Sequence, residues 1–263
     1  MLRTVLFSAL ACASLLSTTS AAAEKSDASA PATVVLVHGA FADGASWNKV
    51  IAILNSWGVS SIAVHSPLTS LQDDVDATRR AIKAAPGKVV LVGHSWGGTV
   101  ITQAGVDAQV SALVYVAAFA PDVGQNSADQ GRDFPVPPGL SSLQNRDGFL
   151  WLSQAGVARD FAPDLKPRES RLLFNTQAPI KASAFGEAVT QAAWRTKPSW
   201  YVIARNDHML APQLQAATAQ RIHAQVSSTG SGHVAPLSQP REVAFAILEA
   251  AGVKTQDSVQ EGG

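Results

Sequence analysis

The chain has 263 residues, of which 46% are hydrophobic, and its 20 Lys and Arg residues are balanced by 20 Asp and Glu residues. A chain of this length buries roughly 70–75% of its unfolded surface, enough for a self-sufficient core in one large domain or two small ones. The charge balance argues against a nucleic-acid-binding protein, which needs a basic excess, and the apolar fraction argues against disorder.

Residues 1–23 have the pattern of a signal peptide. A positive charge at Arg3 precedes an almost wholly apolar run, and Ala21–Ala23 fits the small-residue rule for cleavage before Glu24. The apolar run is far shorter than the roughly 20 residues that span a bilayer, so we expect no membrane insertion. We therefore expect a periplasmic or secreted protein whose mature chain is residues 24–263.

The single cysteine, Cys12, lies inside this leader. The mature chain then has no disulfide and must be stable through packing alone. A lipid-modified Cys12 is the alternative, but the sequence before it is a poor approach to such a site and the apolar run is short.

Strands and helices alternate through the first half of the mature chain. Runs of β-branched residues such as Thr33–Val37 predict strands that are buried on both faces of a parallel sheet. Segments with apolar residues at helical spacing separate these strands. The predicted strands are 33–37, 60–64, 88–92 and 110–115, and the predicted helices are 47–57, 73–84 and 99–106. This alternation predicts an α/β protein with a mainly parallel, doubly wound sheet.

The alternation breaks in the middle of the chain and then resumes. Residues 118–197 are too long a departure for a loop and predict an insertion over the edge of the sheet, which we call the cap. Helical pieces are expected in it at 148–158, 169–174 and 182–195. After the cap, the predicted elements are a strand at 199–204, a helix at 212–222, a short strand at 224–227 and a helix at 241–250.

The sequence GHSWGG at residues 93–98 is the first chemical signal. A G-x-S-x-G pattern alone is weak, because it arises by chance in many chains. Here it lies between a buried strand and an apolar helix, the context that a sharp strand-to-helix turn with an exposed serine requires. Ser95 is therefore the candidate nucleophile, and the alternative is a serine that only caps the helix.

A serine hydroxyl needs a base to take its proton, and the base needs a third group to hold it. With this kind of turn, the order along the chain should be Ser, then Asp or Glu, then His. Asp207 follows the strand at 199–204, and His233 follows the last strand. Because strand ends of a parallel sheet meet at one edge, we expect Asp207 and His233 to lie beside Ser95.

Other acids and histidines compete for these roles. Asp122 follows the strand at 110–115 and is an alternative acid. His208 adjoins Asp207 but should point away from Ser95, while His223 is expected at the surface and His65 in a loop. No histidine or carboxylate pattern has metal-ligand spacing, so neither a metal nor another cofactor is predicted.

Negative charge that develops on a substrate oxygen needs preformed donors. One is the backbone N–H of Trp96, directly after the nucleophile, and the second should come from the loop after the first strand. In that loop the N–H of Ala40 is the preferred donor, with Phe41 close behind. His38 is expected to brace this loop through hydrogen bonds.

These motifs together resemble the α/β-hydrolase fold family, and most of all its small esterase branch, which includes plant methyl-salicylate-type esterases and hydroxynitrile lyases. The resemblance implies a small helical cap over Ser95 that shapes an apolar pocket. Phe41, Trp96, Phe149 and Trp151 are candidates for its walls. The lyase members carry a lysine directly after the catalytic histidine, whereas this sequence has Val234, which argues against lyase chemistry.

The resulting hypothesis is a serine carboxylesterase that acts on a small-molecule ester through an acyl-enzyme. Two alternatives stay open: a lactonase, for example one acting on acyl-homoserine lactones, that uses the same three residues, and a binding protein of the same fold that turns over weakly. Neither the particular ester nor the oligomeric state follows from the sequence.

Overall fold

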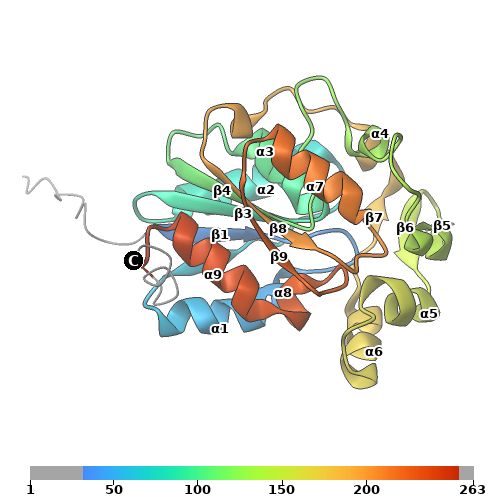
Figure 1. Ribbon diagram of the computed structural model, residues 1–263. Coiled ribbons are helices and arrows are strands. Elements are labelled where there is room, and N and C mark those ends of the chain that lie inside the picture. The colour runs from blue at the N-terminus through green and yellow to red at the C-terminus, as the bar shows by residue number, and fades with distance from the viewer. Residues whose placement is uncertain (1–31, 255–263) are drawn as a thin grey trace, which may run out of the picture. The chain divides into compact units, whose positions relative to one another are not determined.

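The computed structural model describes residues 32–254 of the chain (Figure 1). The predicted signal peptide, residues 1–23, lies outside the described residues. Between residues 32 and 254, no helix is both long enough and apolar enough to cross a membrane.

Six parallel strands form the central sheet. In their order across the sheet they are β2 (Ser61–Ala63), β1 (Thr33–Val37), β3 (Val89–His94), β4 (Val110–Val116), β8 (Ser199–Ala204) and β9 (Gln225–Thr229). The register places Val37 opposite Gly93, and Gly93 opposite Tyr115. The carboxyl ends of the strands therefore meet at one edge of the sheet. The predicted α/β fold is confirmed, and the strand bounds differ from the predicted ones by at most two residues.

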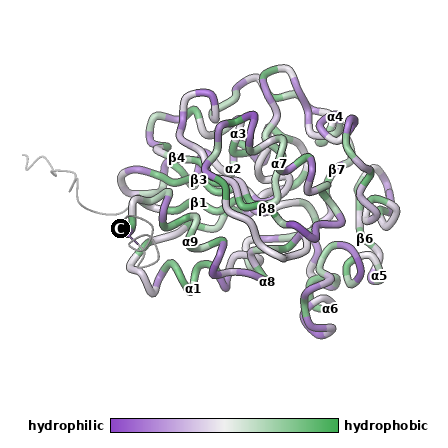
Figure 2. Tube along the Cα trace, in the orientation of Figure 1, coloured by the Kyte–Doolittle hydropathy of each residue, from purple (hydrophilic) through white to green (hydrophobic). Residues whose placement is uncertain are grey.

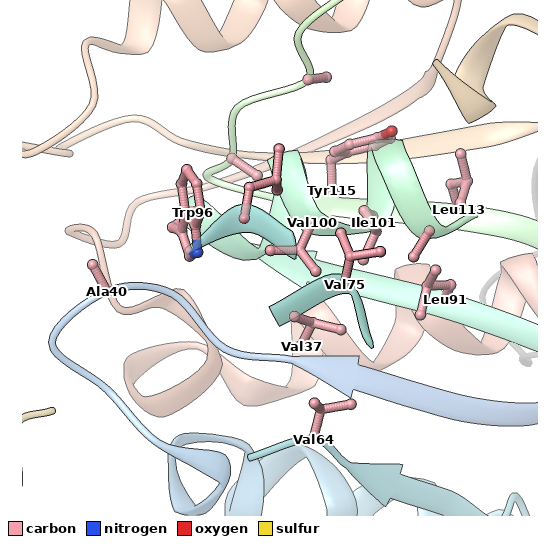
Figure 3. Close-up of a cluster of buried hydrophobic side chains, with 14 of the residues drawn as sticks. Val37, Ala40, Val64, Val75, Leu91, Trp96, Val100, Ile101, Leu113 and Tyr115 are labelled. Carbon is pink, nitrogen blue, oxygen red and sulfur yellow. The ribbon is translucent and has the colours of Figure 1, made fainter. Parts of the chain in front are cut away.

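Alternate residues of each strand face opposite sides of the sheet, and both sides are covered. Leu91 belongs to one buried cluster and Val90 to the other. Figure 2 shows apolar residues concentrated in the central strands. Figure 3 shows part of the cluster that contains Leu91, on what we call the first side of the sheet. Burial of each large aliphatic side chain contributes about 1.5–3 kcal/mol. The first side is covered by α2 (Leu71–Ala84), α3 (Trp96–Ala104) and α7 (Pro212–Arg221), and the second by α1 (Asn48–Ser56), α8 (Ala235–Ser238) and α9 (Pro240–Ala250).

Helix α2 begins two residues before its predicted start because Ser70 caps it. The Ser70 side chain accepts a hydrogen bond from the backbone N–H of Asp73. Asp73 and Asp74 lie in the first turn, where the helix dipole favours negative charge.

The cap contains a small antiparallel sheet in addition to helices. Its strands are β5 (Leu143–Arg146), β6 (Phe149–Leu152) and β7 (Ile180–Lys181). The prediction of a helix over 148–158 is therefore wrong at its start. Asp147 and Gly148 both have positive φ, 52° and 81°, and form a two-residue hairpin turn between β5 and β6. Asp-Gly is a preferred sequence for such a turn, so the local signal was present in the sequence.

The helical part of the cap is made of short pieces. The predicted helix at 169–174 is confirmed within a helix over residues 167–176, whereas 182–195 is not one helix but two single turns joined by irregular chain. The helices are α4 (Ser127–Gln130), α5 (Gln154–Gly156) and α6 (Pro167–Thr176), with further helical turns at 138–142, 157–161, 182–186 and 193–195.

Candidate active site

Ser95 is the single residue between the end of β3 and the start of α3. Its backbone has φ 53° and ψ −118°, a region that L-residues avoid and that costs about 1–3 kcal/mol. Its side chain makes no capping hydrogen bond to α3, which removes the interpretation of Ser95 as a helix cap. The surrounding structure thus holds a strained backbone in order to present this hydroxyl.

Two glycines make this turn possible. A Cβ on Gly93 would lie 2.5 Å from the carbonyl oxygen of Gly97, and a Cβ on Gly97 would collide with the carbonyl oxygen of Val37. Any side chain at either position would push α3 away from the sheet. The glycine spacing is therefore a requirement of close packing around Ser95.

The structure brings the three candidate residues of the sequence into one hydrogen-bonded chain. His233 Nε2 lies 2.9 Å from Ser95 Oγ, and His233 Nδ1 lies 2.7 Å from Asp207 Oδ2. All three side chains are buried, with 8% of Ser95, 3% of His233 and 4% of Asp207 exposed. Asp207 follows β8 and His233 follows β9, and these adjacent strands carry both residues to the edge where β3 ends.

The carboxylate of Asp207 is held by more than His233. Its Oδ1 accepts hydrogen bonds from the backbone N–H groups of Met209, at 2.7 Å, and Leu210, at 2.9 Å. Its Oδ2 also accepts a bond of 2.8 Å from Nε2 of Gln215 in α7. These donors fix the plane of the carboxylate relative to the imidazole.

Gln215 is a site residue that the sequence analysis missed. It is fully buried, donates to both Asp207 and the Leu210 carbonyl, and accepts a hydrogen bond from the Ala204 N–H. Its only sequence signal is a glutamine on the apolar side of a short helix, which is too common a pattern to identify a role.

His94, directly before the nucleophile, was also missed. Its Nε2–H donates to the backbone carbonyl of His233 at 2.9 Å, and the two rings have centroids 4.9 Å apart. Burial lowers the pKa of His94 to about 3, so the ring is neutral at ordinary pH. His94 therefore supports the backbone of His233 from behind.

The loop after β1 lies directly against Ser95. A Cβ on Gly39 would be 2.8 Å from the Ser95 Cβ. The N–H of Phe41 already donates to the Ala178 carbonyl at 3.1 Å, whereas those of Ala40 and Trp96 have no hydrogen-bond partner among residues 32–254. The Ala40 and Trp96 amides are thus the better candidates for holding an oxyanion.

His38 braces this loop as the sequence predicts. Its Nδ1–H donates to the Gly39 carbonyl at 2.9 Å, and its Nε2 accepts from the Ser66 N–H at 3.1 Å. Burial lowers the pKa of His38, which keeps the ring neutral and preserves this donor and acceptor arrangement.

An apolar pocket opens above Ser95. Ser95 and His233 supply the only polar side chains in its lining, and no charged side chain is present. Phe41 is part of the wall, as predicted. The remaining walls are formed by Ala40, Phe119, Leu140, Leu143, Leu150, Phe161, Phe185, Met209 and Leu210.

The predicted wall residues Phe149 and Trp151 do not line this pocket, and neither does Trp96. Neighbouring residues of a strand face opposite sides, so Leu150 of β6 lines the pocket and its two aromatic neighbours do not. Phe149 lies beneath the Lys181 ammonium group, and Trp151 lines a separate cavity of about 390 Å³. The indole of Trp96 is buried against Asp74.

The competing residues lie elsewhere. Asp122 is paired with Arg195 at 2.7 Å, and this contact lowers the pKa of Asp122. His208 faces Asp160 at 3.7 Å, and His65 and His223 are exposed. In the described part of the chain, no three His, Cys, Asp or Glu side chains are grouped so as to hold a metal ion.

Comparisons with known proteins find similar sequences and similar folds. The chain is similar to the protein named "Probable hydrolase R7" from Phoma sp., with 27% identity over 248 residues that cover 84% of this chain and 98% of the relative. Its fold is similar to that of a pyrethroid hydrolase from Sphingobium faniae, with a TM-score of 0.71, 20% identity, and coverage of 84% and 97% of the two chains. Polyneuridine aldehyde esterase gives a TM-score of 0.73, with 20% identity and coverage of 84% and 99%.

A family model adds the decisive match. It is described as "Alpha/beta hydrolase family" and matches residues 34–246, which extend from strand β1 into helix α9. The match includes Ser95, Asp207 and His233. The chain therefore belongs to the alpha/beta hydrolase family.

Proposed function

We propose that this protein is a serine carboxylesterase that hydrolyses small to medium apolar esters through an acyl-enzyme. The observation that carries this proposal is the continuous chain of hydrogen bonds from Asp207 through His233 to Ser95, which ends at an apolar pocket.

In the first half of the reaction, Ser95 Oγ attacks the ester carbonyl while His233 Nε2 takes the hydroxyl proton. Asp207 holds the imidazole in the tautomer whose Nε2 is free to accept this proton, and it stabilises the imidazolium that forms. The Ala40 and Trp96 amides hold the oxyanion. His233 then gives its proton to the leaving alcohol.

In the second half, water enters and His233 takes its proton. The resulting hydroxide attacks the acyl-Ser95 carbonyl, and the same two amides hold the second oxyanion. Collapse of this intermediate breaks the bond to Ser95 Oγ, which regains its proton from His233, and the acid is released.

The pocket lining supports a neutral substrate. A charged group placed among four phenylalanines and several leucines would lose its hydration without gaining a partner, which costs several kcal/mol. The names of the similar structures contain the words hydrolase and esterase, which supports the hydrolysis of an ester. Val234, where the lyases of the family carry lysine, supports hydrolysis over lyase chemistry.

The test is the Ser95→Ala variant, assayed with p-nitrophenyl acetate and butyrate. We expect turnover to be abolished while circular dichroism shows an unchanged fold. Unchanged turnover would refute the proposal. A panel of linear esters and lactones, followed by proton release, separates the esterase from the lactonase. A single burst of acylation with no steady turnover would favour the weakly catalytic binding protein.

We also propose that the protein is exported and that residues 1–23 are removed. The charge at Arg3, the apolar run and the Ala21–Ala23 site support this. Amino-terminal sequencing of the protein from the periplasm or medium should begin at Glu24, and an intact Met1 on exported protein would contradict it.

A further inference from the structure

Asp74 is a buried carboxylate that the proposed reaction does not use. It lies in the first turn of α2 with 0% of its surface exposed. Its Oδ2 accepts a hydrogen bond of 2.8 Å from the indole Nε1–H of Trp96, and its Oδ1 accepts one of 2.7 Å from the backbone N–H of Leu68. The ion pairs found among residues 32–254 do not include Asp74.

A buried carboxylate of this kind lowers the stability of the folded protein when it is ionised. Burial raises the pKa of Asp74 to about 6, against the lowering effect of its bonds to Trp96 and Leu68. Because the folded-state pKa lies above the ordinary value of 3.8, the contribution of Asp74 to stability is fully present below about pH 4 and is lost as the pH rises to about 6. The protein therefore keeps an ionised Asp74 at neutral pH at the expense of stability, which points to a role in function.

The two partners of Asp74 connect it to the turn that carries Ser95 and to the cap. Trp96 directly follows Ser95, and Figure 3 shows it at one end of the buried cluster that also contains Val75 of α2. The Trp96 ring packs edge-on against Phe185, with centroids 5.1 Å apart, and Phe185 lines the pocket. Leu68, whose backbone has φ 58°, lies on the other side of Asp74. Its carbonyl oxygen accepts a hydrogen bond of 2.8 Å from the backbone N–H of Lys181 in the cap.

We propose that Asp74 is a positioning residue: by holding the Trp96 indole, its carboxylate fixes the first turn of α3 and directs the Trp96 amide toward the oxyanion. This inference rests on the proposed function, because it assigns Asp74 a role in that reaction. It also explains why an aromatic ring with an N–H, and not a plain apolar side chain, follows the nucleophile.

Protonation of Asp74 should loosen this arrangement. Both of its oxygens face N–H donors, so a proton on either oxygen displaces one of the two hydrogen bonds. The charged groups that face Asp74 are Asp73 on its own helix and Glu187 from the cap. The two elements that pack most closely against α2, α3 and β1, carry no ionisable side chain. Turnover should therefore fall below about pH 6 in part through Asp74.

The experiment compares Asp74→Asn, Trp96→Phe and the double variant by kcat and KM for a p-nitrophenyl ester between pH 5 and pH 8. Asparagine keeps the shape of Asp74 but presents an amide group to one of the two donors. We expect each single variant to lose about tenfold in kcat at pH 8 with little change in KM, less than the hundred- to thousandfold lost when an oxyanion donor is removed outright. The double variant should be no slower than the slower single variant, because both changes act through the same contact between residue 74 and the Trp96 indole.

The pH dependence separates positioning from a merely structural role. The ratio of wild-type to Asp74→Asn turnover should shrink toward one at pH 5, where wild-type Asp74 is itself protonated, and this ratio cancels every pH effect that the two proteins share. Asp76→Asn, the same change at a half-exposed position of α2 that pairs with Arg79, is the matched control and should behave as wild type. If Asp74→Asn does not fold, Trp96→Phe tests the same bond from its other end.

Three results would overturn the inference: wild-type kcat in Asp74→Asn or Trp96→Phe, losses that multiply in the double variant, or a ratio that does not change with pH. Failure of the proposed function has a different signature, since Ser95→Ala would then keep its activity. An inactive Ser95→Ala together with an unaffected Asp74→Asn overturns only the role of Asp74.

Discussion

The central sheet and the cap contribute different things to the same pocket. Every polar group proposed to react comes from a loop at the carboxyl edge of the sheet: Ser95, Asp207, His233 and the Ala40 and Trp96 amides. The cap contributes only apolar side chains: Phe119, Leu140, Leu143, Leu150, Phe161 and Phe185. The proposed reaction therefore depends on residues at the edge of the sheet, whereas selection among substrates depends on the cap.

The two regions are nevertheless tied together beside the reacting groups. Asp164 of the cap accepts a 2.9 Å hydrogen bond from the N–H of Gly232, the residue before His233. The N–H of Gly139 in the cap donates to the carbonyl of His208, the residue after Asp207, at 2.8 Å. The cap therefore contacts the loops that carry the base and the acid, in addition to covering Ser95.

The largest effect should come from the sheet. Asp207→Asn keeps the shape of the side chain but favours the wrong imidazole tautomer, so kcat for a p-nitrophenyl ester should fall about ten-thousandfold. Asp122→Asn is the control, because Asp122 pairs with Arg195 away from the site. If Asp122→Asn loses the activity and Asp207→Asn does not, the acid has been assigned to the wrong strand.

A smaller effect is expected behind Asp207. Gln215→Met nearly preserves the volume of the side chain. It leaves the Ala204 N–H without an acceptor and removes one hydrogen-bond donor from the Asp207 carboxylate. Urea denaturation should show a loss of about 1–3 kcal/mol in the free energy of unfolding, and kcat should fall about tenfold. Gln220→Met on the exposed side of α7 is the control. Equal stability of the two variants would show that Gln215 is not needed to hold this end of the sheet.

The cap should change selectivity more than turnover. Leu150→Ala enlarges the pocket, so the kcat/KM ratio of p-nitrophenyl hexanoate to acetate should rise about tenfold, within the range that one or two methylene groups decide. Trp151→Ala removes a larger side chain from the adjacent position but should leave this ratio unchanged, because Trp151 lines the other cavity. A larger response to Trp151→Ala would mean that β6 presents its other side to the substrate.

The smallest effect is expected where the cap meets the loop of His233. Asp164→Ala removes one exposed acceptor, worth about 0.5–1.5 kcal/mol, and should lower kcat/KM severalfold. Asp133→Ala, an exposed carboxylate elsewhere in the cap, serves as the control. Identical kinetics in the two variants would show that the hydrogen bond to Gly232 does not help to place His233.

The sequence predicts the site on the sheet better than the walls in the cap, for a physical reason. Ser95, Asp207 and His233 each follow a strand, and parallel strands bring such positions together whatever the details of packing. In the cap, the predicted wall residues were the large aromatic residues Phe149 and Trp151. The hairpin turn at Asp147 and Gly148 sets the strand so that Leu150 faces the pocket instead.

Residue periodicity and glycine spacing by themselves determined the order of strands and helices, the strained turn at Ser95 and the three residues that meet there. These features have local signatures, since burial on both faces requires continuous apolar runs and close approach requires glycine. Only the tertiary structure decided that Gln215 holds Asp207, that His94 supports His233 and that Asp74 holds Trp96. Such contacts join distant segments through side chains that look ordinary in their own helix or strand, so they exist only after the helices have packed against the sheet.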